Sequence, residues 1–445
     1  MNTPLRIGLA ATAALFFSAL PTWAADFTVE TAVLDNGLQV VVVPDHRAPL
    51  ITQAVYYKAG AADEPTGKGG LAHFLEHMMF QGTTNIPGED FRNTIARHGG
   101  EENAFTAQDM TGYWQTVAVE AMEIVMELEA DRMTNLRIKP EEFESERQVI
   151  KEERRSRYDS DPSGPFSEHM SAAVFLAHPY RLPVIGWMHE IESHTVQDAI
   201  DWYKKFYVPN NAILVIAGDT TLAEVMPLAE KYYGVIPRGA DVVRLRPQEP
   251  PQLAERRVIL YDDRVREPSF SRSYVTNSRT ARDGLAPALS MLSQILSGST
   301  GRLYQALVVD QGIATSAGAF YSGGTMDQTQ FGLWIAPAQG ADLTAMEAAL
   351  DAEIARVVAD GVTQDELDLA RNGTLSRLIF SRDSVTRLGR RVGAGLVIGL
   401  TIEEIVGWSD EILAVTVADV NASAAMVFNR AHSATGLMLP QPDKD

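Results

Sequence analysis

His73, Glu76 and His77 are the residues of this sequence whose types and spacing most clearly suggest chemistry. They lie in residues 70–83, GLAHFLEHMMFQGT, where the histidines are four apart and Glu76 directly precedes the second. On a helix, residues four apart lie on one face, about one turn from each other. Two neutral imidazoles on one face are typical zinc ligands, and the adjacent carboxylate could take a proton from a water on the metal. The alternative is a half-buried helix whose histidines bond backbone carbonyls.

A catalytic zinc site needs a third protein ligand and an open position for water. The acidic segment 140–157, PEEFESERQVIKEERRSR, is predicted to be helical from Pro140, because proline suits the first turn of a helix. Glu146 and Glu153 are seven residues apart and share one helix face with Ile150. Periodicity does not choose between the two glutamates, and a merely solvated charged helix is the competing interpretation.

The composition limits the kinds of site and partner. The chain has 445 residues, 45% of them hydrophobic and 22% charged, which suits two to three globular domains. The net charge of −20 argues against a nucleic acid or an anionic membrane as partner. The sequence contains no cysteine, so disulfides and thiolate ligands are excluded. A tightly held transition metal must therefore use His, Asp or Glu.

The first 24 residues are predicted to be a secretory signal peptide. One positive charge at Arg6 precedes an apolar run of fourteen residues, and small residues precede a predicted cleavage after Ala24. An uncleaved membrane anchor is the alternative. No other apolar run approaches membrane-spanning length, so we expect a mature chain without a membrane segment, in the periplasm or outside the cell.

Two pairs of similar short segments indicate that the chain contains two related α+β units of roughly 200 residues. GLAHFLEHM at 70–78 resembles GLAPALSML at 284–292, and TVQD at 195–198 resembles TVAD at 416–419. The two offsets, 284 − 70 = 214 and 416 − 195 = 221, differ by only seven residues. The second copy has Pro287, Ser290 and Met291 in place of the two histidines and the glutamate. Only the first copy contains the two histidines and the glutamate of the candidate site.

A composition shift predicts where the units meet. Residues 25–240 are predicted to form an N-terminal domain that carries the candidate zinc site, and residues 258–445 a C-terminal homologous domain without zinc ligands. Residues 241–257, rich in proline and charge, form the predicted linker.

Three motifs, in order, give the chain a resemblance to a known family. HFLEH is followed by NAFT at Asn103–Thr106 and by ERQVIKEE at Glu146–Glu153. The chain resembles the pitrilysin/insulinase family of HxxEH zinc metallopeptidases, in particular its two-domain bacterial forms and the mitochondrial processing peptidase subunits. The resemblance runs from about Phe27 to the C-terminus. It implies an α+β fold of two homologous domains, each a mainly antiparallel sheet with helices packed on one face, together forming half of a clamshell.

The resemblance implies a role for each candidate residue of the metal site. It implies one zinc ion per chain, held by His73, His77 and Glu153, with Glu76 as the general base. Glu146 matches the carboxylate that orients a zinc histidine through its other ring nitrogen. The implied activity is zinc-dependent hydrolysis of peptides or unfolded polypeptide segments.

The resemblance also implies a site for the peptide substrate. Asn103, Ala104 and Phe105 match an edge strand that pairs with an extended substrate through backbone hydrogen bonds. Without the resemblance, the same residues are equally typical of an ordinary edge strand packed against a helix.

One departure from the family pattern suggests a partner. Self-sufficient members carry an arginine and, seven residues later, a tyrosine that contact the substrate near the zinc. In GRLYQALVVDQGIAT these positions hold Val308 and Thr315. The resemblance then implies that this chain is the catalytic member of a heterodimer, whose related partner lacks HxxEH and supplies the pair.

Two other functions remain open from the sequence. A non-catalytic subunit on the same scaffold is the first alternative, although such subunits tend to lose the ligand residues. A periplasmic zinc-handling protein is a weaker one, because the remaining histidines show no ligand-like spacing. These are His46, His98, His169, His178, His189, His194 and His432.

Overall fold

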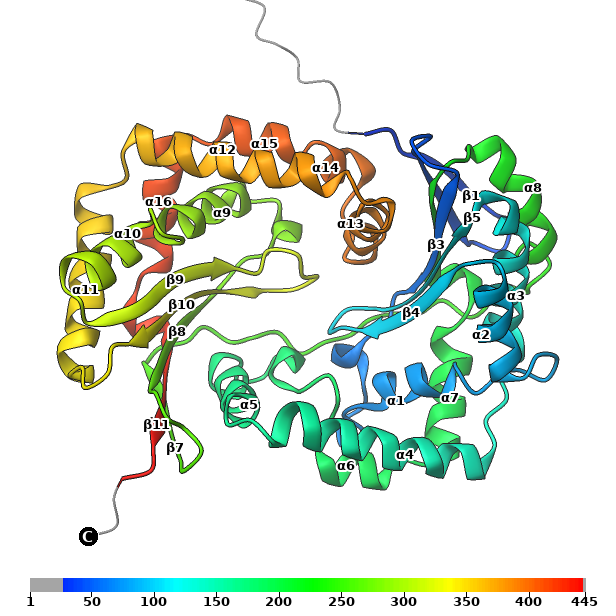
Figure 1. Cartoon of the computed structure of the whole chain (residues 1–445), viewed down its shortest axis with the longest axis horizontal. Helices are drawn as coiled ribbons and strands as arrows, with labels where there is room; N and C mark the ends of the chain where they lie inside the picture. The colour runs from blue at the N-terminus through cyan, green and yellow to red at the C-terminus, as the bar shows by residue number, and fades with distance from the viewer. Residues whose placement is uncertain (1–26, 443–445) are drawn as a thin grey trace, which may run out of the picture.

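The structure, a computed structural model, describes residues 27–442 and has two lobes, each built around one sheet (Figure 1). The predicted signal peptide and its cleavage site lie outside the described residues. The first sheet has the order β1-β2-β6-β3-β5-β4. Its strands are β1 (Glu30–Val33), β2 (Gln39–Pro44), β3 (Leu50–Tyr57), β4 (Glu101–Thr106), β5 (Thr111–Ala118) and β6 (Ala212–Gly218).

The second sheet repeats the topology of the first without an equivalent of β1. Its order is β7-β11-β8-β10-β9, and each sheet contains one parallel pair, β2 with β6 and β7 with β11. All other pairs are antiparallel. The mainly antiparallel sheets and the internal duplication are therefore confirmed. The strands are β7 (Arg256–Asp262), β8 (Ser269–Thr276), β9 (Ala314–Tyr321), β10 (Thr329–Pro337) and β11 (Ser433–Pro440).

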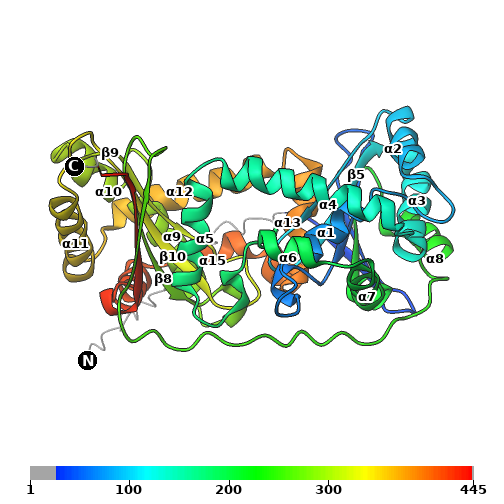
Figure 2. The ribbon, with the colours of Figure 1, turned by 90° about the horizontal axis from the view of Figure 1, so that it is seen from below.

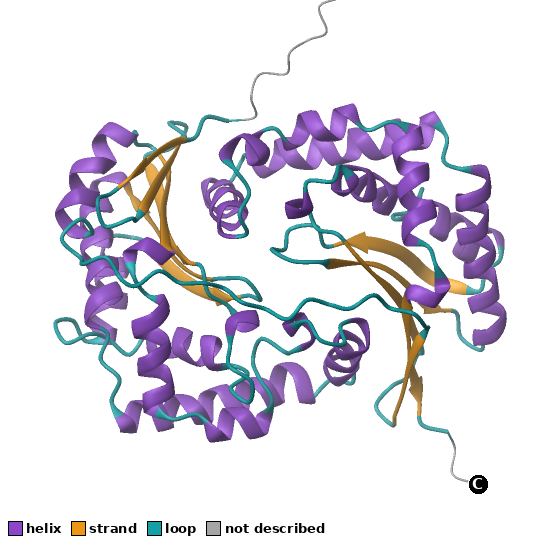
Figure 3. Cartoon of the chain, turned by 180° about the vertical axis from the view of Figure 1, so that it is seen from behind, coloured by secondary structure: helices purple, strands orange, loops and turns teal. Residues whose placement is uncertain are grey.

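Most helices in the first half of the chain lie on one side of the first sheet (Figure 3). The helices of this half are η1 (Ala61–Asp63), α1 (Leu71–Met78), α2 (Gly88–Arg97), η2 (Val119–Ala121), α3 (Met122–Asn135), α4 (Pro140–Arg154), η3 (Arg155–Asp159), α5 (Ser163–Val174), η4 (Pro179–Arg181), α6 (Met188–Ser193), α7 (Val196–Phe206), η5 (Pro209–Asn211) and α8 (Leu222–Tyr232).

The helices of the second half follow the same general order. They are η6 (Arg279–Ala281), α9 (Leu285–Leu296), α10 (Arg302–Tyr304), η7 (Gln305–Asp310), α11 (Leu343–Asp360), α12 (Gln364–Ser381), α13 (Val385–Val397), α14 (Ile402–Val406), α15 (Trp408–Ala414), α16 (Val417–Val427) and η8 (Arg430–His432). Among residues 27–442, no helix combines the length and the apolar character that crossing a membrane requires.

The repeated TVQD and TVAD sequences start equivalent helices. Thr195 and Asp198 form a capping box at the start of α7, and Thr416 and Asp419 form one at the start of α16. In such a box each side-chain oxygen accepts a hydrogen bond from the other residue's backbone N–H, which satisfies amide groups that the helix leaves unpaired. Each helix is followed by an interior strand of its sheet, β6 or β11.

Each sheet is covered on its second face by a helix from the other half of the chain, which the sequence pattern did not indicate. Helix α13 packs against β3 and β6, and α5 packs against β7 and β11 (Figure 1). The strand β6 is buried along its whole length, so its sheet needs apolar cover on both faces. Exchange of α5 and α13 supplies this cover and joins the two lobes.

An extended segment that follows α8 runs along one side of the molecule to the second sheet (Figure 2). The strand β7 begins at Arg256, so it takes up the last two positions of residues 241–257. Arg246 of this segment pairs with Asp63, Asp109 and Asp327, at 2.9, 2.6 and 2.8 Å. The ion pairs join η1, the β4–β5 turn and the β9–β10 turn, so they connect the segment to both lobes.

Candidate metal centre

His73, His77 and Glu153 come together at the contact between α1 and α4. Nε2 of His77 lies 3.2 Å and Nε2 of His73 lies 3.8 Å from Oε2 of Glu153. One ligand atom from each residue lies within 4.8 Å of the others. The spacing of four puts both histidines on one face of α1, and Glu153 lies in the last turn of α4. The structure thus selects Glu153 rather than Glu146 for this group.

The group fits a zinc ion in its ligand chemistry and its dimensions. Two imidazole nitrogens and a carboxylate oxygen form a common ligand set of catalytic zinc. Ligands about 2.0–2.2 Å from a tetrahedral ion lie roughly 3.3 Å from one another, close to the 3.2 and 3.8 Å between the histidine nitrogens and Oε2 of Glu153. The site also favours positive charge at His77. Burial opposes protonation of this ring, but its hydrogen bonds with Glu146 and Glu153 outweigh burial and raise the pKa of His77 to about 9.

Glu146 lies beside the group and holds one of its histidines. Its Oε2 is 3.0 Å from Nδ1 of His77, and its Oε1 accepts a hydrogen bond of 2.8 Å from Nε2 of Gln81. A proton on Nδ1 leaves the lone pair of Nε2 free to face Glu153. Gln81 follows His77 by four residues, just beyond the end of α1, a helical spacing that could have identified it from the sequence.

Glu76 is held from the neighbouring sheet. Oγ1 of Thr106, the last residue of β4, donates a hydrogen bond of 2.6 Å to Oε2 of Glu76. Burial raises the pKa of Glu76, and the hydrogen bond from Thr106 works against that rise. Thr106 belongs to the NAFT motif, but spacing along the chain did not reveal that its hydroxyl contacts Glu76.

A cavity of about 240 Å³ opens at these residues. It is lined by Glu76, His77, Phe80, Gln81, Arg92 and Glu146. The carboxylate of Glu76 and the ring of His77 therefore face one space, in which a water and a substrate bond could meet.

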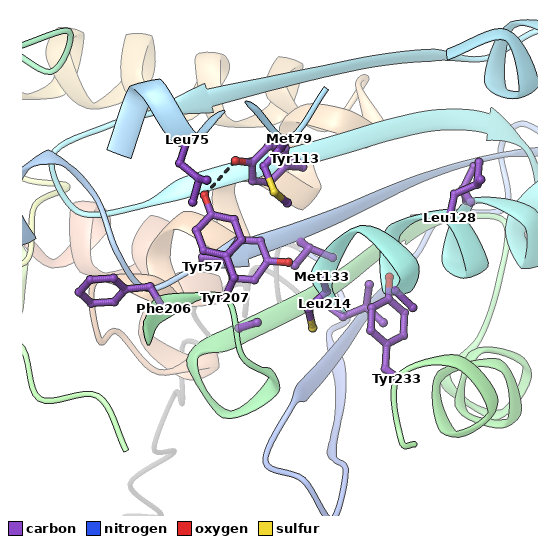
Figure 4. Packing of buried hydrophobic residues seen from close by; sticks show 14 of the residues in the cluster. Tyr57, Leu75, Met79, Tyr113, Leu128, Met133, Phe206, Tyr207, Leu214 and Tyr233 are labelled. Atoms are coloured by element: carbon purple, nitrogen blue, oxygen red, sulfur yellow. Dashed lines mark hydrogen bonds between the residues drawn. The ribbon is translucent and has the colours of Figure 1, made fainter. Parts of the chain in front are cut away.

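Helix α1 is fixed at both its buried face and its start. Leu75 and Met79 are fully buried and lie beside the hydrogen-bonded hydroxyls of Tyr113 and Tyr207 (Figure 4). At the start, the carboxylate of Glu64 accepts hydrogen bonds from the backbone amides of Gly70 and Ala72, at 2.9 and 2.7 Å. A carboxylate at a helix N-terminus satisfies unpaired amides and interacts favourably with the helix dipole.

Glycine is required where α1 begins. Gly70 has a φ of 87°, a backbone conformation that side chains rarely adopt, and Ile185 and Gly186 pack closely against it. The neighbouring carbonyl of Gly69 is bonded by Nε2 of the buried His194, at 3.1 Å. These contacts set the position of the two histidines relative to α4.

The predicted substrate strand is the edge strand β4. Within the described residues, β4 pairs only with β5, so its other edge has no strand partner. Ala104 packs with the core under α1, on the same face as Thr106. Phe105 faces the opposite side, where it contacts Tyr56 and the guanidinium of Arg390 on α13. Asn103 is exposed, and its side chain accepts a hydrogen bond from the amide of Ala104.

The two departures from the family pattern lie in the second lobe. Val308 is half-buried in η7 and packs against the apolar core of that lobe. Thr315 is exposed on β9, and its hydroxyl donates to the carbonyl of Ala336 at 3.2 Å. Neither side chain offers a cation or a phenol.

Comparison with known proteins gives the same family for both halves of the chain. Residues 39–186 match the family described as "Insulinase (Peptidase family M16)", and residues 193–374 match "Peptidase M16 inactive domain". The chain is 28% identical over 415 residues to the zinc protease PqqE of Helicobacter pylori, covering 92% of this chain and 93% of that protein. It is 30% identical over 423 residues to an uncharacterized zinc protease of Mycobacterium leprae, covering 91% and 90%.

Solved structures share the fold over nearly the whole described chain. A protease from Helicobacter pylori superposes with a TM-score of 0.87 at 28% identity, covering 93% of this chain and 100% of that one. The periplasmic protease PqqL from Escherichia coli gives a TM-score of 0.77 at 20% identity, covering 92% of this chain but 47% of that one. Matches in sequence and in fold extend along both lobes, and the chain belongs to peptidase family M16.

Proposed function

We propose that this chain is a zinc-dependent endopeptidase that hydrolyses peptides or unfolded polypeptide segments and holds one zinc ion. The observation that carries the proposal is the convergence of His73, His77 and Glu153 within 4.8 Å. Glu76 lines the same cavity as His77, so its carboxylate is available as the proposed proton acceptor. The names of the similar zinc proteases support the same reaction class.

In this mechanism His73, His77 and Glu153 hold the metal, and Glu76 moves the proton. A zinc ion held there would make a bound water acidic near neutral pH and would polarise the scissile carbonyl. Glu76 accepts the proton of the attacking water and passes it to the leaving amide nitrogen. Thr106 holds the Glu76 carboxylate by a hydrogen bond of 2.6 Å. Glu146 keeps the Nε2 lone pair of His77 directed toward the metal through its contact with Nδ1.

The open edge of β4 is proposed to bind the substrate as an added strand. Backbone pairing of this kind gives affinity with limited demand on sequence, and it requires an extended, unfolded substrate. Thr106 ends this strand and contacts Glu76, so a peptide paired along β4 passes directly over the proton acceptor.

A related subunit without HxxEH is proposed to complete the site. Val308 and Thr315 cannot donate hydrogen bonds to a substrate as arginine and tyrosine do. The fold of this chain matches about half of PqqL, which is consistent with an assembly of two such halves. The partner would supply the arginine and tyrosine. We also propose that the protein acts in the periplasm or outside the cell, after removal of the first 24 residues.

Metal analysis together with a peptide digest tests the proposed function. We expect about one zinc ion per chain, and we expect a chelator to remove both the metal and the hydrolysis of an unfolded polypeptide. Added zinc should restore both. A zinc-free protein with unchanged peptidase activity would contradict the proposal. A zinc-loaded complex from the native host that cleaves no peptide would support the non-catalytic alternative instead.

A further inference from the structure

A second cavity, of about 360 Å³, lies next to the metal centre and has no part in the mechanism above. It is enclosed by η3, the first turns of α5, and η4 with the loop that follows it. Arg157 and Arg181 line it, together with the hydroxyl-bearing side chains of Ser163, Ser167 and Ser171.

Two contacts join this cavity to the catalytic residues. Nη1 of Arg157 donates a hydrogen bond of 2.5 Å to Oε1 of Glu153, the candidate zinc ligand. Gln108 also lines the cavity, and it follows Thr106 by two residues at the end of β4. Its amide is fixed by a hydrogen bond of 2.8 Å to the carbonyl of Leu182. A peptide that pairs with β4 and continues past Thr106 therefore reaches the cavity within a few residues.

The charge that the cavity presents is positive. Glu168 is the acidic residue in its lining, but its carboxylate is buried and bonded at both oxygens by Arg154, at 2.8 and 3.0 Å. The charge of Glu168 is thus offset by a partner that does not line the cavity. Arg157 and Arg181 are both exposed, but the charge of Arg157 is offset by Glu153. Arg181 is therefore the cation that can meet a ligand.

Building on the proposed peptidase function, we propose that this cavity is a substrate subsite that selects an acidic side chain close to the scissile bond. Arg181 is the specificity-determining residue, because among residues 27–442 its guanidinium donates only to a backbone carbonyl, that of Leu176 at 3.3 Å. A carboxylate that accepts from a guanidinium forms a charge-assisted hydrogen bond, which is stronger than a neutral one. A lysine or arginine side chain in the same place would meet like charge.

Peptide binding to an inactive enzyme tests the subsite without relying on turnover. The enzyme purified from its native host is first used to locate the scissile bond in an unstructured peptide by mass spectrometry. That peptide is then made with Glu, Gln or Lys at each position flanking the bond, and with an amidated C-terminus so that no terminal carboxylate competes. Affinities are measured by fluorescence anisotropy with the zinc-loaded Glu76→Gln chain.

We expect one position at which Glu binds about tenfold more tightly than Gln and Lys binds more weakly than both. Arg181→Glu should reverse this order with unchanged zinc content. Arg155→Glu is the matched control, because Arg155 is an exposed arginine of η3 that bonds Glu152 and lies outside the cavity lining.

Two results overturn the proposal while the peptidase function stands. These are equal affinities for Glu, Gln and Lys at every position of a peptide that is cleaved, and an unchanged order in Arg181→Glu. If the enzyme cleaves no peptide at all, the proposed function fails and the subsite fails with it.

Discussion

The side chain of Glu146 is bonded at both oxygens, by Nδ1 of His77 and by Nε2 of Gln81. This arrangement determines which nitrogen of His77 faces Glu153, and therefore which nitrogen can bind a metal. Orientation by a neighbouring carboxylate also makes the imidazole a better donor to the metal. The role predicted for Glu146 is consistent with this geometry.

Replacement of Glu146 by Gln is expected to weaken zinc affinity by roughly 10- to 100-fold. The reason is that a neutral amide orients and polarises the His77 ring less strongly than a carboxylate. Competition with a chromophoric chelator measures the affinity. Glu144→Gln is the control, since Glu144 is an exposed glutamate of the same helix that contacts Arg147 and Gln148. Equal zinc affinity in the wild type and Glu146→Gln would exclude the orienting role.

The hydroxyl of Thr106 is expected to position the proton acceptor. Thr106→Val keeps the shape of the side chain but removes the donor to Glu76, so we expect kcat to fall about tenfold with little change in KM. Thr106→Ser keeps the donor and should recover most of the rate. The steady-state kinetics of these two variants provide the measurement. A valine variant as fast as the wild type would show that the hydroxyl of Thr106 does not position Glu76.

Part of this site follows from the sequence and part does not. The spacing of His73 and His77 specifies a common helix face, because four residues make about one helical turn. The choice of Glu153 over Glu146 depends on how α4 crosses α1, which periodicity along α4 cannot give. The contact of Thr106 with Glu76 joins residues 30 apart and depends on the fold in the same way.

At the scale of elements, α5 and α13 are equivalent helices that each pack on the sheet of the other half. Short side chains allow this close approach. A Cβ atom on Gly393 of α13 would clash with the ring of Tyr56, and one on Gly436 of β11 would clash with Met170 and Phe166 of α5. The sequence predicted the strands, capping boxes and duplication from local patterns. It could not predict the exchange, because an amphipathic helix does not reveal which sheet it covers.

Gly393→Ala is expected to destabilise the protein by about 1–3 kcal/mol, because the added methyl group overpacks the contact between α13 and Tyr56. Gly373→Ala in α12 is the control. There the nearest atom to a new Cβ is Nη1 of Arg377 at 3.8 Å, so the higher helix propensity of alanine should stabilise by up to about 1 kcal/mol. Urea unfolding measures the free energy of unfolding of both variants. A stabilised Gly393→Ala would contradict the close packing of α13 on β3.

At the scale of the molecule, the buried ion pairs of the segment that follows α8 connect the two lobes. The side chains of Asp63, Asp109 and Arg246 are each less than 5% exposed. Breaking one member of such a group leaves an uncompensated buried charge. The segment also contacts the turn after β4, through the ion pair of Arg246 with Asp109.

Arg246→Ala is expected to destabilise the protein by about 3–5 kcal/mol, since two buried carboxylates lose a partner. Arg238→Ala is the matched control, because this arginine precedes β7 in the same connection, is exposed, and pairs with Asp241 alone among the described salt bridges. We expect the control to change stability by less than about 0.5 kcal/mol. Calorimetry distinguishes the two. A small effect of Arg246→Ala would show that these ion pairs do not hold the lobes together.

The activity of the purified single chain tests the proposed partner subunit. If the arginine and tyrosine come from a related subunit, the pure single chain should bind zinc but hydrolyse peptides slowly. Full turnover by the pure single chain would contradict the heterodimer.

In the proposed catalytic centre, His73, His77 and Glu153 hold a zinc ion, and Glu76 is the proton acceptor. The most direct measurement compares peptide hydrolysis by the wild-type enzyme and by Glu76→Gln, each assayed with its zinc content. We predict that the variant keeps about one zinc ion per chain and loses roughly two to four orders of magnitude in rate. A variant that keeps both zinc and the wild-type rate would contradict the account.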